Sequence, residues 1–235
     1  DTLIFGTHVF VPSRLYKLCR SKAFLFRGVT IRWSCDPSLI KAGDDTPAEA
    51  VLHFPGGLAD SLTDELGATA PLLTPLWAGD ASLPPAADGA DNGRAEWAVA
   101  FLESGSAALA SYCNTIPTPQ GGTHETGFRN ALVKGLRAWG EQRSNKKAAA
   151  ITAEDVLGMI AAKLSVFVRD PQFQGQTKEK LTSSEASKLV ETALRDRFDH
   201  YLAQNPPQAD GLLGFVIERA EERLRRREQK DTCLL

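Results

Sequence analysis

The domain expected from this sequence is built around the segment Asp170-Pro171-Gln172-Phe173-Gln174-Gly175-Gln176-Thr177-Lys178-Glu179-Lys180-Leu181. A strand is predicted before it, because Ile160, Ala162, Leu164, Val166 and Val168 alternate with other residues. An amphipathic helix is predicted after it, from a capping box at Thr182-Ser183-Ser184-Glu185 to about Asn205, where Pro206-Pro207 ends it. The quoted segment is therefore a strand-to-helix connection with a glycine hinge.

This connection can hold two hydrogen-bond donors out from the body of the domain. Lys178 offers an ammonium group, which acts as a point charge, and Gln176 offers a neutral amide. Two such donors suit a phosphate group. The residues of the turn by themselves are more typical of a solvated connector, and the surrounding sequence is what favours a phosphate contact.

Composition places the chain among ordinary globular proteins. Its 235 residues allow one large or two small domains, with 43% hydrophobic and 24% charged residues. The net charge of −2 does not indicate a general nucleic-acid binder, so any DNA contact has to come from a local patch. The four cysteines form no Cys-x-x-Cys pair, and we expect reduced cysteines, no zinc site and a cytoplasmic setting.

Neither a signal peptide nor an apolar run of transmembrane length is visible, so no membrane partner is expected. The first residues read as mid-sequence, without an initiator methionine, and we expect a piece of a longer protein.

Upstream of the segment, the pattern predicts alternating helices and strands. A helix capped by Ser13 is followed by strands at residues 29–33 and 51–54 and a helix at residues 58–66. Residues 67–93 are an extended loop with room for one strand. Residues 96–103 and 109–114 are expected to pair as an antiparallel meander.

A tight turn at residues 114–122 precedes a helix that Thr123 can cap. The apolar face of this helix carries Phe128, Leu132, Leu136 and Trp139. Asn130, Lys134 and Arg137 fall roughly opposite that face. They are either a solvated surface or a surface that meets a polyanion. A last helix, residues 211–230, begins apolar and becomes charged, so its distal half should project or pair with another helix.

Several catalytic and nucleotide-binding signatures are missing. The sequence has no Walker loop, no Gly-x-Gly-x-x-Gly after a strand, no His-Glu-x-x-His and no Gly-x-Ser-x-Gly. Glu154 and Asp155 do not form a paired-carboxylate site, because adjacent helical residues point to different faces. We therefore expect no complete nucleotide site within this chain.

Three stretches, in order, carry a family resemblance: residues 114–129, with Gln120-Gly121-Gly122-Thr123-His124; residues 164–173; and residues 174–181, with Gln176-Thr177-Lys178. They resemble the second domain of the B subunit of bacterial type IIA DNA topoisomerases. The early part from Pro12 to Val29 is similar to the same family. Gly57-Leu58-Ala59-Asp60 favours the topoisomerase IV members over gyrase.

The resemblance implies an α/β fold with a mixed sheet and helices on one face. It implies a transducer domain, similar to ribosomal proteins, with a left-handed βαβ crossover and a protruding C-terminal helix. The expected division is a lead-in from an ATPase domain at residues 1–12, the transducer at 13–207, and a charged helix and tail at 208–235.

The resemblance also implies a function, which is the transduction of an ATP signal in a type IIA topoisomerase. In that family a separate domain holds ATP, and one lysine of the transducer reaches its γ-phosphate. By motif match that catalytic and ATP-binding lysine is Lys178, with Gln176 beside it. Lys134 and Arg137 would face DNA. The implied partners are DNA, the A subunit of topoisomerase IV and a second copy of the B subunit. Mg²⁺ is used by the whole enzyme but is not ligated here.

The chain alone is not expected to hydrolyse ATP or relax DNA. Its last residues, Asp231-Thr232-Cys233-Leu234-Leu235, differ from the family's usual continuation. Three alternatives stay open: the same domain of gyrase, a stand-alone nucleic-acid-binding module, and an interaction scaffold using the charged helix.

Overall fold

The computed structural model describes residues 2–5, 10–104 and 107–233. Two compact units make up the chain, Asp1–Asp64 and Glu65–Leu235. The domain boundaries expected after residues 12 and 207 are not tested by this division, and they stay predictions.

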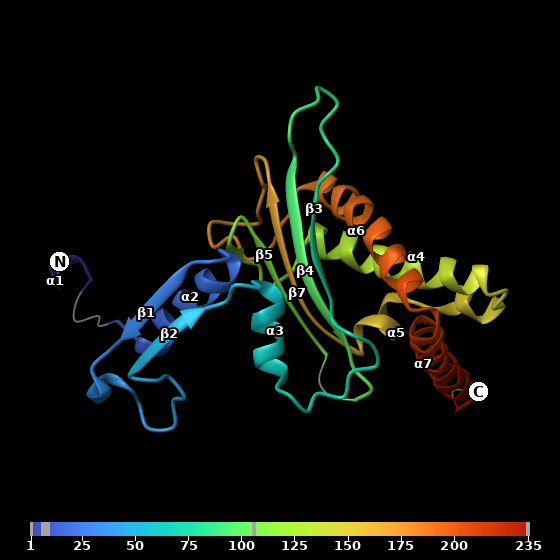
Figure 1. Cartoon of the computed structure of the whole chain (residues 1–235), viewed down its shortest axis with the longest axis horizontal. Helices are drawn as coiled ribbons and strands as arrows, with labels where there is room; N and C mark the ends of the chain where they lie inside the picture. The colour runs from blue at the N-terminus through green and yellow to red at the C-terminus, as the bar shows by residue number, and fades with distance from the viewer. Residues whose placement is uncertain (1, 6–9, 105–106, 234–235) are drawn as a thin grey trace. The chain divides into compact units, whose positions relative to one another are not determined.

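The first unit contains a short helix, a longer helix and a two-stranded sheet (Figure 1). Its elements are α1 (Thr2–Phe5), α2 (Pro12–Leu25), β1 (Thr30–Ser34), η1 (Pro37–Leu39), β2 (Glu49–His53) and most of α3 (Leu58–Leu66). Helix α2 begins at Pro12 with Val11 as its N-cap, so Ser13 is not the cap. Proline suits this position because the first amide of a helix has no intrahelical partner. Strands β1 and β2 are antiparallel, with Thr30 opposite His53.

The second unit is built on a five-stranded mixed sheet in the order β3-β4-β7-β5-β6. Its strands are β3 (Trp77–Ser82), β4 (Gly93–Phe101), β5 (Ala108–Cys113), β6 (Ile116–Pro117) and β7 (Ile160–Val168). Strand β7 has the predicted bounds. It pairs antiparallel with β4, placing Trp97 opposite Leu164, and parallel with β5.

The predicted meander of residues 96–103 and 109–114 is wrong. Strand β5 does not pair with β4, because β7 lies between them in the sheet. Most of β7 is buried, and a central position satisfies both of its hydrogen-bonding edges. The chain between the parallel strands β5 and β7 is thus a crossover that contains β6, α4 (Thr123–Gln142) and α5 (Ala153–Leu157). The handedness of this connection stays a prediction.

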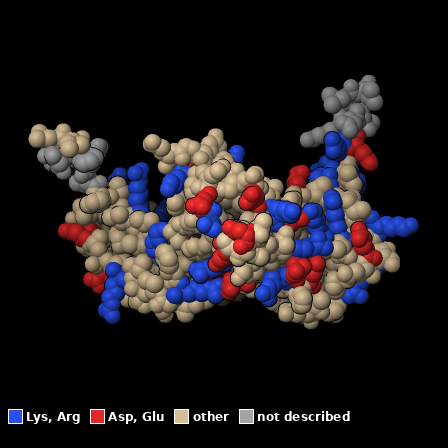
Figure 2. All heavy atoms as spheres, turned by 90° about the horizontal axis from the view of Figure 1, so that it is seen from above, with Lys and Arg blue, Asp and Glu red and all other residues tan. Residues whose placement is uncertain are grey.

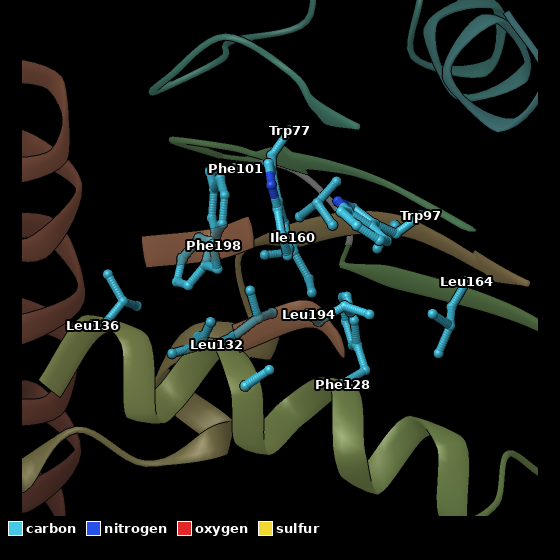
Figure 3. Close-up of a cluster of buried hydrophobic side chains, with 14 of the residues drawn as sticks. Trp77, Trp97, Phe101, Phe128, Leu132, Leu136, Ile160, Leu164, Leu194 and Phe198 are labelled. Carbon is cyan, nitrogen blue, oxygen red and sulfur yellow. The ribbon is translucent and has the colours of Figure 1, made fainter. Parts of the chain in front are cut away.

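Two long helices, α4 (Thr123–Gln142) and α6 (Ser184–Gln204), lie side by side against the sheet (Figure 1). Figure 3 shows the core between them and the strands. It combines side chains from β3 and β4, from α4 and from α6, including Trp77, Trp97, Phe101, Phe128, Leu132, Leu136, Leu194 and Phe198. The expected mixed sheet with packed helices is confirmed.

The crossover also contains two short elements, η2 (Lys146–Ala150) and α5 (Ala153–Leu157), and α7 (Pro206–Cys233) closes the unit. Thr152 and Asp155 form a capping box on α5. The buried Asp155 carboxylate also accepts from Arg223 of α7 at 2.8 Å. Burial alone would raise the pKa of Asp155, but hydrogen bonds from Arg223 and Thr152 hold that pKa below its usual value.

Helix α7 begins at Pro206, earlier than the predicted residue 211. Its first half is buried through Ala209, Leu212, Leu213, Val216, Ile217 and Ala220. Beyond Ala220 the described side chains are exposed or half-buried, as expected for a helix that leaves the core. Within the described residues, no helix combines the length and the apolar character needed to cross a membrane.

Candidate functional site

The connection between β7 and α6 is a loop whose base is bonded to the turn before α4. Gln120 N donates to Glu179 O at 3.0 Å, Leu181 N donates to Gly121 O at 3.1 Å, and Thr123 N donates to Leu181 O at 3.1 Å. Leu181 is fully buried, and it also bridges to Phe173 across the loop. The two motif-bearing stretches therefore meet backbone to backbone, although they are far apart in the sequence.

Gly122 makes this contact possible. Its φ of 146° and ψ of −166° lie in a region that is open almost only to glycine. A Cβ atom there would lie 2.3 Å from the Leu181 carbonyl oxygen and 2.7 Å from the Leu181 nitrogen. The glycine thus lets the base of the loop lie directly on the start of α4.

The loop is closed by a bond from Gln174 N to Lys180 O at 2.9 Å, and its tip, residues 175–178, lies beyond this bond. Gln176 and Lys178 are both exposed there. Gly175 has φ +71° with open space around it, and Lys178 has φ +57°. A left-handed conformation costs a residue with a Cβ roughly 1–2 kcal/mol. Strained residues of this kind cluster at ligand-binding and switch sites, which makes Lys178 a candidate for such a role.

The Lys178 ammonium is available for a ligand. Its nearest aromatic contact is the Phe173 ring, whose centroid lies 5.8 Å from Nζ. In the described part of the chain, no carboxylate forms an ion pair with it. The neighbouring Glu179 carboxylate instead accepts a hydrogen bond from the Gln120 amide at 2.6 Å. The cation is therefore exposed and uncompensated while the anion next to it is engaged elsewhere.

A buried polar network supports the turn beneath the loop. The Ser111 hydroxyl donates to Glu125 Oε1 at 2.7 Å and lies 2.7 Å from Thr118 Oγ1. Thr118 Oγ1 in turn lies 3.1 Å from His124 Nε2. Burial, with the charge of Arg129 as the smaller cause, lowers the pKa of His124 to about 4. The imidazole is neutral at pH 7, so it is a structural part of the turn.

The two expected DNA-facing residues are already engaged with their own domain. Lys134 forms an ion pair with Glu191 of α6, and its side chain is 54% exposed. Burial alone would raise the pKa of Glu191, but hydrogen bonds from Lys134 and Asn130 hold that pKa below its usual value. Arg137 donates through Nε and Nη2 to the Ile151 carbonyl oxygen. On the face that Figure 2 draws, Lys and Arg lie among Asp and Glu.

Other chemical groups give no further candidate. The described residues contain no cluster of three or more His, Cys, Asp or Glu side chains placed to hold a metal ion. Cys113 is fully buried, and burial raises its pKa to about 12, so it is a poor nucleophile. The predicted capping box at Thr182-Ser183-Ser184-Glu185 is wrong. The N-cap of α6 is Ser183 rather than Thr182, and it makes no side-chain capping bond; its hydroxyl accepts from Gln172 N at 2.8 Å.

Sequence patterns identified Lys178 and Gln176 but missed the pair of Gln120 and Glu179. Both of these residues lie in motifs that were singled out, yet they are 59 positions apart. No periodicity in the sequence links them, because their contact depends on how the crossover returns to the sheet.

Comparison with known proteins places these features in a family. Residues 57–232 match the family described as DNA gyrase B. The B subunit of DNA topoisomerase 4 from Caulobacter vibrioides is 50% identical over 236 aligned positions, covering 98% of this chain and 33% of that protein. The corresponding protein from Bartonella bacilliformis is 47% identical, with the same coverage. The chain thus spans about a third of the length of these curated relatives.

Solved structures agree with the sequence matches. The 43K ATPase domain of Thermus thermophilus gyrase B, solved with an aminocoumarin, superposes with a TM-score of 0.74 at 25% identity, covering 99% of this chain and 59% of that one. The ATP-binding domain of Francisella tularensis topoisomerase IV, solved with a small-molecule inhibitor, gives a TM-score of 0.69 at 28% identity, with 94% and 57% covered.

Proposed function

This chain belongs to the DNA gyrase B family, and we propose that it contains the transducer domain of a topoisomerase B subunit, which senses the terminal phosphate of ATP. Another part of the full-length protein holds most of the nucleotide, and the exposed loop reaches across to it. Lys178 contacts the γ-phosphate and Gln176 donates beside it. The loop thereby couples ATP hydrolysis to the capture and passage of DNA.

The observation that carries this proposal is the state of Lys178. Its ammonium is exposed, the described residues offer it no carboxylate partner, and its backbone is held in a left-handed conformation on an anchored loop. A buried or ion-paired lysine would have to break contacts before reaching a phosphate. This lysine is preorganised to meet a negative charge, which lowers the cost of binding.

The expected coupling follows from charge. When Lys178 contacts the γ-phosphate, the loop and the sheet behind it are tethered to the part of the protein that holds the nucleotide. ATP supplies a phosphoryl group that leaves on hydrolysis, and the tether is then lost. Because the ammonium binds one nucleotide state better than the other, it shifts the balance between two domain arrangements.

We assign the chain to topoisomerase IV rather than gyrase because the relatives named above at 50% and 47% identity are topoisomerase 4 proteins. As part of such an enzyme the chain would work with DNA, with the A subunit of topoisomerase IV and with a second copy of its own B subunit, in the cytoplasm. Lys134 and Arg137 are proposed to line the DNA-facing wall. Mg²⁺ would act with ATP outside this chain.

Replacing Lys178 by alanine in the full-length protein tests the proposal. A charge-assisted hydrogen bond is worth about 1.5–3 kcal/mol, so we expect ATP turnover to fall by about tenfold or more. Strand passage should be lost with it, while the circular dichroism spectrum and ADP affinity stay unchanged. Lys180→Ala is the matched control, because it removes the same charge two residues away and should retain activity. ATPase activity unchanged by Lys178→Ala would refute the assignment.

A further inference from the structure

A side-chain hydrogen bond joins Gln120 to Glu179, the residue next to Lys178. Glu179 follows Lys178 directly, so its carboxylate is the nearest anion along the chain. It is held by the Gln120 amide, with Nε2 donating to Oε2 at 2.6 Å. The backbone repeats this contact, because Gln120 N donates to Glu179 O. Two bonds therefore hold Glu179 on the turn before α4.

We propose that Gln120 is a positioning residue, which keeps the Glu179 carboxylate away from the Lys178 ammonium and from the phosphate that Lys178 meets. This inference rests on the proposed function of Lys178. It adds that Gln120 keeps a neighbouring negative charge from cancelling the positive charge of Lys178. Without the amide, the carboxylate is free to turn toward Lys178. It would then neutralise the ammonium and repel the phosphate, since like charges that approach each other weaken binding.

The surroundings support a role in charge control. The tip of the loop is exposed and space is open around Gly175, so Lys178 lies on a part of the loop that solvent reaches. The base of the loop has its own backbone bonds at Leu181, and these do not depend on the Gln120 side chain. Removing the amide should therefore change charge at the tip more than it changes the fold of the loop.

A double-mutant cycle in the full-length protein separates charge control from simple bracing. The variants are Gln120→Ala, Glu179→Gln and the two combined. Glu179→Gln keeps an oxygen that can accept from Gln120 and removes the negative charge. Equilibrium affinity is measured for a non-hydrolysable ATP analogue and for ADP, which lacks the γ-phosphate. The ratio of the two affinities isolates the contact at the terminal phosphate, independently of turnover.

Gln120→Ala should weaken binding of the ATP analogue about fivefold, the size of a surface ion pair, without changing ADP affinity. Glu179→Gln should bind like the parent protein. The double variant should also bind like the parent, because no competing carboxylate remains. If the double variant is as weak as Gln120→Ala, the amide only braces the loop and the inference is wrong. Unchanged binding by Gln120→Ala also overturns it.

Failure of the inference is distinct from failure of the proposed function. Lys178→Ala reports on the function: loss of analogue affinity supports it, whatever Gln120→Ala does. If Lys178→Ala leaves the ratio of affinities unchanged, the proposed function fails and the inference fails with it. Lys180→Ala serves again as the charge-matched control and should leave the ratio within about twofold, because the proposal gives Lys180 no contact with the phosphate and the field of an exposed charge is screened by solvent and salt.

Discussion

Gly122→Ala tests whether the loop is fixed by direct contact between two backbones. The substitution has two costs. The glycine-only conformation at φ 146° should cost about 1–3 kcal/mol for alanine. The new Cβ would also lie 2.3 Å from Leu181 O, so the backbone segments around Gly122 and Leu181 must separate. That separation breaks the bonds from Leu181 N and from Thr123 N, at about 1 kcal/mol each. The total is about 3–5 kcal/mol.

The assay is native-state hydrogen exchange on the full-length protein, followed in peptides that cover residues 120–124 and 178–183. Local opening that becomes easier by about 3 kcal/mol raises exchange of the Thr123 and Leu181 amides by about a hundredfold. Gly175→Ala is the control. Its φ of +71° brings a strain of about 1–2 kcal/mol, but no atom lies within 4 Å of the new Cβ. It should leave both amides protected.

Equal protection of the Thr123 and Leu181 amides in Gly122→Ala and in the parent protein would refute the reasoning. The loop would then be held by something other than the contact at Gly122. Loss of protection in Gly175→Ala to the same degree would also contradict it, because strain alone would then explain the effect.

Three further predictions concern the buried turn and the face of α4 that carries Lys134 and Arg137. The free energy of unfolding should fall from about pH 6.5 to about pH 4, because His124 has a pKa near 4 when folded and 6.5 as a model group, so the unfolded chain takes up a proton first. The shift in pKa corresponds to about 3 kcal/mol of stability. Denaturant melts at several pH values should show that the free energy of unfolding depends less on pH in His124→Gln than in the parent protein. The same pH dependence in both proteins would contradict the prediction. Lys134→Ala should lower the salt dependence of duplex DNA binding by about one unit of slope, while Lys41→Ala, an exposed lysine of the first unit, should not. If Lys134→Ala binds DNA as the parent protein does, the proposed contact between Lys134 and DNA is wrong. Arg137→Ala should mainly reduce stability, by about 1–2 kcal/mol, because both of the Arg137 hydrogen bonds go to the Ile151 carbonyl oxygen.

The wrong strand pairing has a physical origin. Strand β5 was predicted to pair with β4 because the two are neighbours along the chain. In the structure β7 takes that place, although it follows much later in the sequence. Periodicity reports which residues are buried, and it reports this for each segment separately. The choice of partner depends on which edges remain free once the crossover helix has packed, and no local pattern records that.

The sequence by itself determined the local elements and the chemistry at the loop tip. The alternation from Ile160 to Val168 predicted β7 with its bounds, since a period of two is set by the pleat of one strand. It also placed Lys178 and Gln176 on a connection rather than inside an element. The tertiary structure alone decided that Leu181 rests on Gly122 and that Gln120 holds Glu179. These contacts join residues 59 positions apart, and they exist only because the parallel pairing of β5 and β7 brings the start of α4 beside the end of the loop.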